Sequence, residues 1–233
     1  MDKLNLDQHI SRQFNDDLER IKSLTLEMGG LVEQQLKEAL DALENADSKL
    51  AQHVLEKETR VDEMERDIDE ICTTTIALRQ PAASDLRMIL AVTKTIRDLE
   101  RMGDEANKIA KMAISLSESG TSPRGYIEIR HISHGVRDIL ASCLNAFTRF
   151  DVAVALETLK KDEQIDRDYR SAIRELVTYM MEDPRSISRV MNILWALRAL
   201  ERIGDHAKNI CEHVVFLVEG KDIRHGHMDE VQK

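Results

Sequence analysis

Aromatic residues and prolines are scarce in this sequence, and their scarcity restricts the fold. Only 3% of the 233 residues are aromatic, three are prolines and nine are glycines. Leu, Ala, Glu, Arg, Lys and Asp predominate instead. Long helices accommodate this composition better than β-sheets do. We therefore expect an all-α protein.

Cysteine is also rare. Cys72, Cys143 and Cys211 are scattered along the chain, and none belongs to a CxxC pair. This spacing indicates neither a disulfide framework nor a thiolate zinc site. Each cysteine falls at a helical position where a small buried side chain is expected. Free thiols fit a reducing compartment.

Long hydrophobic runs are missing as well. The N-terminus has no apolar segment of signal-peptide length, and no run approaches the roughly 20 apolar residues of a membrane span. The net charge of −10 makes nucleic-acid binding unfavourable and favours cations or basic partners. No nucleophile with its base, phosphate loop or dinucleotide fingerprint is present. We expect a cytoplasmic protein that is not an enzyme.

Apolar residues recur at helical spacing along almost the whole chain. The Gly29-Gly30 pair predicts a kink or a tight helix crossing. Ser84 is expected to cap a helix, and Trp195 is expected to be packed in the core. The predicted turns fall at residues 44–48, 79–85, 117–125, 150–151 and 182–186. These turns predict six helices, three on each side of the loop near residue 122.

The two halves are copies of one another. LERMGDEANKI at residues 99–109 returns as LERIGDHAKNI at residues 200–210, an offset of 101. Pro81 corresponds to Pro184 at an offset of 103, and Val61 to Ile165 at 104. Because each amphipathic helix must bury its apolar stripe, we expect two tandem three-helix bundles. They would occupy residues 1–120 and 121–220, followed by a flexible tail over 221–233.

Both copies of the repeated segment carry two carboxylates one helical turn apart, and these point away from the apolar seam of their helix. In an antiparallel hairpin, residues equidistant from the turn are neighbours. The midpoint in sequence between Asp62 and Glu100 is residue 81, which is a proline. The midpoint between Asp166 and Glu201 falls in the Asp183-Pro184 turn. We therefore predict one cluster of four carboxylates on the outer face of each hairpin. The clusters are Glu58, Asp62, Glu100 and Asp104, and Asp162, Asp166, Glu201 and Asp205.

Clusters with only oxygen ligands suit divalent or iron-type metal ions, namely Mg, Mn, Fe or Zn, and do not decide among them. The alternative is a solvated face neutralised by nearby basic residues, which are Arg97, Arg101, Lys108, Arg198, Arg202 and Lys208. Neither copy has the Glu-x-x-His pair of ferritin-like di-iron proteins, which disfavours iron storage as a second alternative. The repeated Gly103 and Gly204 predict close helix packing. His206 points to another face.

The segments LERMGD, LERIGDHAKNI and QPAASDLR (residues 80–87) resemble the PhoU family of regulators associated with bacterial phosphate-specific transport. The resemblance covers nearly the whole chain, including the duplication. The second copy follows the family pattern well. The first copy departs from it, with Glu105 at the position of His206 and Lys108 at that of Asn209.

The resemblance implies an adaptor that is not an enzyme and commonly forms a homodimer. Such proteins bind metal ions at the repeated motif, here Glu100, Asp104, Glu201 and Asp205. They connect a Pst phosphate transporter, through its PstB-type ATPase, to a PhoR-type sensor histidine kinase. Phosphate-starvation genes then stay off while phosphate is plentiful. The implied location is cytoplasmic, or peripheral at the inner membrane through these partners.

Overall fold

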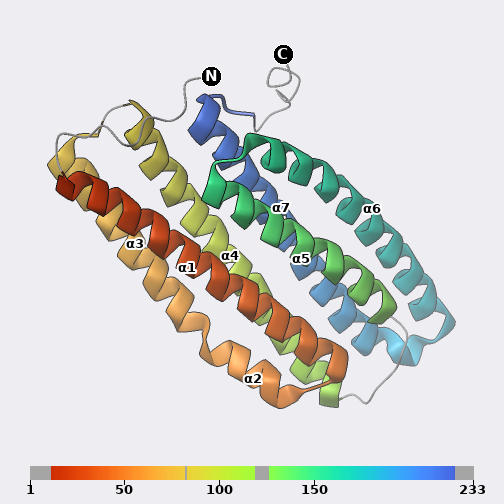
Figure 1. Ribbon diagram of the computed structural model, residues 1–233. Coiled ribbons are helices and arrows are strands. Elements are labelled where there is room, and N and C mark those ends of the chain that lie inside the picture. Colours follow the sequence, from red (N-terminus) through yellow and green to blue (C-terminus); the bar gives the residue numbers. More distant parts are fainter. Residues whose placement is uncertain (1–11, 82, 119–125, 224–233) are drawn as a thin grey trace.

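The computed structural model describes residues 12–81, 83–118 and 126–223, and every regular element in this part of the chain is helical (Figure 1). The first half contains α1 (Arg12–Asn45), α2 (Ser48–Glu56), α3 (Glu58–Arg79) and α4 (Ala83–Glu118). The second half contains α5 (Tyr126–Arg149), α6 (Val152–Glu182), the short 3-10 helix η1 (Pro184–Ser186) and α7 (Ile187–Glu219). The expected all-α class is confirmed.

Each half forms a bundle of three helical segments, and the two bundles join side by side. The most extensive packing between helices is that of α4 against α7, which run antiparallel through the centre of the molecule (Figure 1). A smaller contact of α1 with α5 closes the junction on the other side. The predicted pair of three-helix bundles is therefore present.

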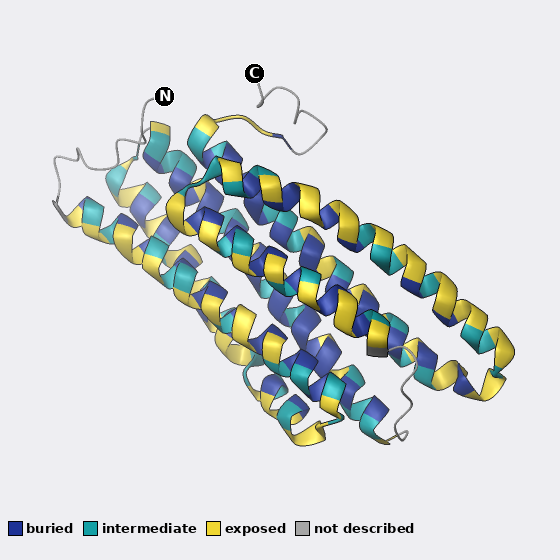
Figure 2. Ribbon diagram, turned by 45° about the vertical axis from the view of Figure 1, so that its right-hand side comes forward, coloured by how far each residue is buried: buried dark blue, intermediate teal, exposed yellow. Residues whose placement is uncertain are grey.

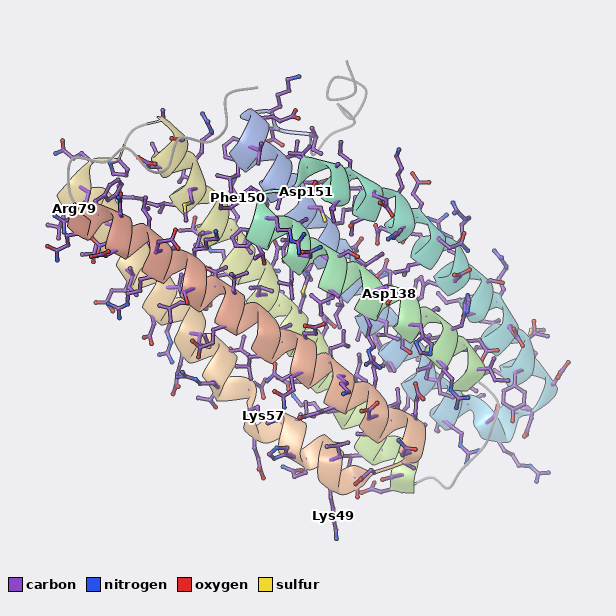
Figure 3. The ribbon with its side chains drawn as sticks, viewed as in Figure 1. Lys49, Lys57, Arg79, Asp138, Phe150 and Asp151 are labelled. Atoms are coloured by element: carbon purple, nitrogen blue, oxygen red, sulfur yellow. The ribbon has the colours of Figure 1, made fainter. Side chains whose placement is uncertain are left out.

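The second helical segment of the first bundle is interrupted where no interruption was predicted. Lys57 separates α2 from α3, and its backbone N–H donates to the carbonyl of Val54, three residues earlier. The Lys57 ammonium donates to Glu38 of α1 at 2.8 Å, which ties the break to the bundle (Figure 3). Neither Gly nor Pro occurs near this position, so composition gave no signal for the break.

The predicted turns at residues 44–48, 150–151 and 182–186 are present, and an acidic residue caps the helix that follows each of them. The end of α3 and the start of α4 fall within the predicted turn at 79–85, and the predicted loop at 117–125 lies mostly outside the described residues. The Asp47 side chain accepts hydrogen bonds from the backbone N–H groups of Lys49 and Leu50 at 3.0 Å. Asp151 caps α6 and Asp183 caps η1 in the same way (Figure 3 labels Asp151). The prediction that Ser84 caps a helix is wrong, because α4 begins at Ala83 and already includes it.

Buried residues follow one face of each helix and meet between the two bundles (Figure 2). The three cysteines are buried free thiols, as expected. The Gly29-Gly30 pair lies within an unbroken α1. A Cβ atom at Gly29 would come within 2.6 Å of Leu144 Cδ2 on α5, so Gly29 marks a tight crossing of α1 and α5.

Candidate functional site

The α3–α4 hairpin brings carboxylates from both of its helices together. Asp62 and Glu65 come from α3, and Glu100 and Asp104 from α4. Burial raises the pKa of Glu100, and the negative charges of Asp104, Glu65 and Asp62 raise it further. The pKa of Glu65 is also raised, first by burial and also by the charges of Asp69 and Asp62. We call Asp62, Glu65, Glu100 and Asp104 the first acidic cluster.

The charges that act most strongly on Glu100 include one that was not predicted, that of Glu65, whereas the membership of Glu58 stays a prediction. Glu58 is the first residue of α3, directly after the break at Lys57. The strongest charges acting on Glu100 come from Asp104, Glu65 and Asp62. Glu65 was not predicted as a member, although it follows Asp62 by three residues and so shares its helical face.

Basic residues compensate the first acidic cluster only weakly. Within the described ranges, none of its four carboxylates has a salt-bridge partner within 4.0 Å. Arg97 and Arg101 are near enough to lower the pKa of Glu65, but burial prevails and the pKa stays raised. Lys108, a predicted partner, binds Glu105 at 2.9 Å instead. The cluster therefore carries excess negative charge.

The α6–α7 hairpin builds a second acidic cluster from Asp162, Asp166, Glu201 and Asp205. The expected outer position of Asp162 is wrong, because this residue is only 4% exposed. Gly204 makes the room for it, since a Cβ atom there would lie 3.0 Å from Asp162 Oδ1. The repeated glycines therefore allow close helix packing, and at Gly204 the group that packs closely is the carboxylate of Asp162.

Burial is also the main cause that raises the pKa of Asp162, to about 6. Lys208 lowers this pKa, whereas Asp166, Asp205 and Glu201 raise it. The pKa values of Glu201 and Asp205 are raised too, by burial first and then by the carboxylates around them. Like charges therefore converge in the second half as they do in the first.

The second acidic cluster has more basic partners than the first. Lys208 Nζ lies 3.8 Å from Asp162 Oδ2, and Arg198 Nη1 lies 3.3 Å from Glu201 Oε2. Asp166 pairs with Arg170 at 3.4 Å. Glu201 Oε2 is nevertheless buried without accepting a hydrogen bond, so its charge is incompletely satisfied.

A difference of one residue type accounts for part of this contrast. At the offset of 104, the counterpart of Glu65 is Tyr169, whose hydroxyl forms a hydrogen bond with Arg198. Tyr169 therefore places a hydroxyl where the first cluster has a carboxylate, and it helps to hold Arg198 beside Glu201. The predicted neutralisation by Arg and Lys is found at Arg198 and Lys208, but Arg202 reaches across to Glu105 on α4.

The pKa of Asp162 predicts a pH-dependent effect on stability. In metal-free buffer, Asp162→Asn is expected to raise the free energy of unfolding by about 1–2 kcal/mol at pH 8, because the variant buries no charge. The folded-state pKa of about 6 lies above the unfolded value of 3.8, so this gain grows between pH 4 and 6 and vanishes below pH 4. Urea denaturation at pH 4 and pH 8 measures it. The exposed Glu163→Gln is the control, and a destabilised Asp162→Asn at pH 8 would refute the assignment.

A polar cluster that the sequence analysis missed lies where α4 meets α7. The carboxylate of Asp98 contacts His206 Nδ1 and His213 Nε2, each at 2.9 Å, and accepts a hydrogen bond from Asn209 Nδ2 at 3.0 Å. Burial raises the pKa of Asp98, but these contacts with His206, His213 and Asn209 outweigh it and lower the pKa to about 2. We call this set the junction cluster.

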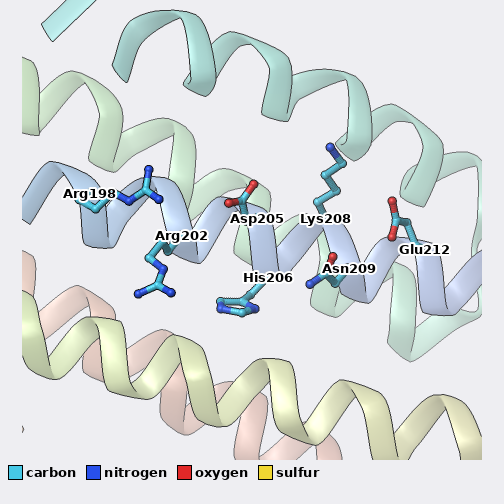
Figure 4. Close-up of a pocket in the computed structure, with 7 residues that line it drawn as sticks. All are labelled: Arg198, Arg202, Asp205, His206, Lys208, Asn209 and Glu212. Atoms are coloured by element: carbon cyan, nitrogen blue, oxygen red, sulfur yellow. The ribbon is translucent and has the colours of Figure 1, made fainter. Parts of the chain in front are cut away.

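The junction explains where the two copies of the motif diverge. His206 and Asn209 both point from α7 towards α4, at the edge of an open hollow beside α7 (Figure 4). Their first-half counterparts, Glu105 and Lys108, pair with each other, and Glu105 also accepts from Arg202 at 2.9 Å. Three of the four divergent residues, Glu105, His206 and Asn209, thus supply polar contacts between the bundles.

Neither acidic cluster has the geometry of a finished metal site. Within residues 12–81, 83–118 and 126–223, no three His, Cys, Asp or Glu side chains form a group that could hold a metal ion as they stand. The donor sets do fit a cation in their chemistry, because only carboxylate oxygens converge and burial and like charge raise the pKa of several of them.

These features define a class of protein, a duplicated three-helix bundle with one acidic cluster on each hairpin. The model of the PhoU domain matches residues 25–113 and 129–214, one match in each half. The chain belongs to the PhoU family. The predicted boundary at residue 120 and most of the predicted tail lie outside the described residues.

Similar proteins cover the chain almost completely. A phosphate-specific transport system accessory protein PhoU homolog of Pseudomonas putida is 57% identical over 97% of this chain and 88% of its own length. The accessory protein PhoU of Escherichia coli is 43% identical over the whole chain and 96% of its own length.

Two solved structures share the fold. The crystal structure of PhoU from Pseudomonas aeruginosa superposes with a TM-score of 0.88 at 57% identity, over 90% of this chain and all of that one. The crystal structure of the phosphate transport system regulatory protein PhoU from Streptococcus pneumoniae has a TM-score of 0.83 at 31% identity. The match covers 90% of this chain and 99% of that one. In the part of this chain that the structure describes, no helix is long and apolar enough to cross a membrane.

Proposed function

We propose that this protein is a negative regulator of the phosphate-starvation (Pho) response and a modulator of phosphate uptake. The observation that carries the proposal is the 57% identity, over 97% of the chain, to an accessory protein of a phosphate-specific transport system. The regulator acts as an adaptor between the PstB-type ATPase of the Pst transporter and a PhoR-type sensor kinase, and is peripheral at the inner membrane through them.

The scaffold supports adaptor work rather than chemistry. Its helices reach 36 residues, or about 54 Å at 1.5 Å per residue, so each bundle offers long faces to partners. Two such faces on one chain allow two partners to be held together, and a homodimer doubles their number. The duplicated architecture thus favours a connecting role.

Metal binding is the second part of the proposal. The two acidic clusters bind divalent or iron-type cations, since a cation offsets the burial and the like charge that together raise the pKa of Glu100, Asp162, Glu201 and Asp205. Side-chain rotations would bring the carboxylate oxygens around the ion. The first acidic cluster, which lacks salt bridges among the described residues, is expected to bind more tightly than the second.

Copurification tests the adaptor role. The protein is tagged in its own cells, which are grown at high and at low phosphate, and the bound proteins are identified. We expect the transporter ATPase and the sensor kinase to be enriched over an untagged strain, and their ratio to change with phosphate. Absence of both partners under both conditions would contradict the proposal.

A further inference from the structure

Five large apolar side chains are exposed at the end of the second bundle, around the α6–α7 turn. Trp195 is among them, so the expectation that it packs in the core is wrong. Their exposed fractions are 41% for Val177, 80% for Met181, 45% for Ile187, 38% for Met191 and 58% for Trp195. We call these five residues the tip patch.

The five residues form one surface rather than isolated exposures. Ile187, Met191 and Trp195 recur every four residues, which places them on one stripe of α7. Met181 and Val177 on α6 are four residues apart and are as far from the turn as Ile187 and Met191. Exposed residues extend over this end of α6 (Figure 2). An apolar surface of this kind, bordered by polar residues, marks an interaction site.

The segment that carries the tip patch has a charge balance opposite to that of the whole chain. Residues 169–200 contain five arginines and three acidic residues, whereas the whole chain has 33 basic and 43 acidic residues. Arg174, Arg185 and Arg198 are all exposed. A second copy of the chain would bring these arginines against one another, which is unfavourable. A partner that offers carboxylates beside apolar side chains is complementary.

The type of basic residue beside the tip patch favours a protein partner over a lipid surface. No lysine occurs between Lys161 and Lys208, so every basic residue that α6 and α7 contribute around their turn is an arginine. Anionic lipid attracts both residue types, whereas protein interfaces are enriched in Arg, Met and aromatic residues and depleted in Lys. Trp and Arg are also the residues that most often dominate the energy of an interface.

Among its described residues, the first bundle shows only part of an equivalent surface. Leu78 and Leu90 are exposed at the counterparts of Met181 and Met191, at offsets of 103 and 101. At the counterpart of Trp195 stands Lys94, whose ammonium lies 5.0 Å from the ring centre of Phe216 on α7. In the part of the chain that the structure describes, the complete patch is therefore found in the second bundle.

We infer that the tip patch (Val177, Met181, Ile187, Met191 and Trp195) with its flanking arginines docks an acidic segment of a partner protein that carries apolar side chains. The apolar side chains of the segment lie against the tip patch, and its carboxylates pair with Arg174 and Arg185. This inference rests on the proposed adaptor function, which supplies two protein partners to test.

The single tryptophan allows a direct test. Protein grown with 5-fluorotryptophan gives one ¹⁹F resonance, because Trp195 is the only tryptophan. The purified transporter ATPase and the detergent-solubilised sensor kinase serve as probes, and affinity is measured separately by calorimetry. We expect one of them to shift the resonance. We expect Met191→Glu and Arg185→Glu each to weaken its binding at least tenfold, and the matched Leu90→Glu to change it less than twofold.

The other outcomes distinguish failure of the docking site from failure of the adaptor function. If either protein binds without moving the resonance and Met191→Glu binds equally well, the docking site is wrong and the adaptor function stands. If neither protein binds, both are overturned. A shift produced only by phosphatidylglycerol vesicles would show that the patch binds a lipid surface. A shift that changes with the concentration of the protein itself would show that the patch is a dimer contact. Either result would overturn the inference. Circular dichroism checks that each variant is folded.

Discussion

Asp98→Ala is expected to lower the free energy of unfolding at pH 7 by about 3–5 kcal/mol, the cost of removing one member of a buried charged network. Asp98 accepts from Asn209 and contacts His206 and His213 across the joint between the bundles. Without the carboxylate, these three side chains lose their common acceptor. Because α4 and α7 form the largest contact between the bundles, the two halves should loosen together.

Asp98→Asn isolates the contribution of the charge. The pKa falls from 3.8 in the unfolded chain to about 2 in the folded protein. The stability from this ionisation is therefore complete above about pH 4, and it is lost as the pH falls towards 2. We expect the variant to be less stable than the parent by about 2 kcal/mol at pH 7. The two should converge near pH 2.

Urea denaturation at pH 7 and at low pH measures both variants. The exposed Asp138→Asn on α5 is the matched control, because it removes the same charge from the surface (Figure 3 labels Asp138). It should change stability by less than about 0.5 kcal/mol. If Asp98→Asn were as harmless as this control at pH 7, the junction cluster would have no part in joining the bundles.

The second large effect concerns metal binding by the acidic clusters. A divalent cation that binds only the folded protein, at 100 times its dissociation constant, stabilises it by about 2.7 kcal/mol. For a chain of this length, that corresponds to a rise in melting temperature of roughly 5–10 °C. Protons compete with the cation for carboxylates of raised pKa, so the rise should be larger at pH 8 than at pH 5.

Charge-neutralising variants assign the effect to each cluster. Glu100→Gln with Asp104→Asn should remove most of the melting-temperature rise with Mn²⁺ or Mg²⁺, because the first acidic cluster has no salt bridges among the described residues. Glu201→Gln with Asp205→Asn should remove less, since Arg198 already lies 3.3 Å from Glu201. Asp67→Asn with Glu70→Gln alters two exposed carboxylates of α3 and is the control. An undiminished rise in both cluster variants would exclude these sites.

The duplication made much of the architecture predictable. Equidistance from Pro81 and from the Asp183-Pro184 turn predicts that Asp62 lies near Glu100 and Asp166 near Glu201. This works because an antiparallel hairpin has little freedom once its turn is known. The break at Lys57 was not predictable, since the surrounding residues favour helix.

Two properties of side chains could not be predicted from the sequence. These are how deeply a side chain is buried and which distant residues it contacts. A helical wheel gives the direction of Asp162 on its own helix, but its burial depends on the missing side chain of Gly204 on another helix. Trp195 lies in an apolar run, yet its stripe of α7 remains uncovered. Asp98 acquires its role from His206 and His213, more than a hundred residues away.

The most direct test of regulation by the acidic clusters is a phosphatase reporter of the starvation genes in cells grown with abundant phosphate. Deleting the gene should switch the reporter on, and the parent protein should restore repression. The variant with Glu100→Gln, Asp104→Asn, Glu201→Gln and Asp205→Asn should stay folded at parental abundance and fail to repress. Full repression by this variant, or an inactive reporter in the deletion strain, would contradict the account.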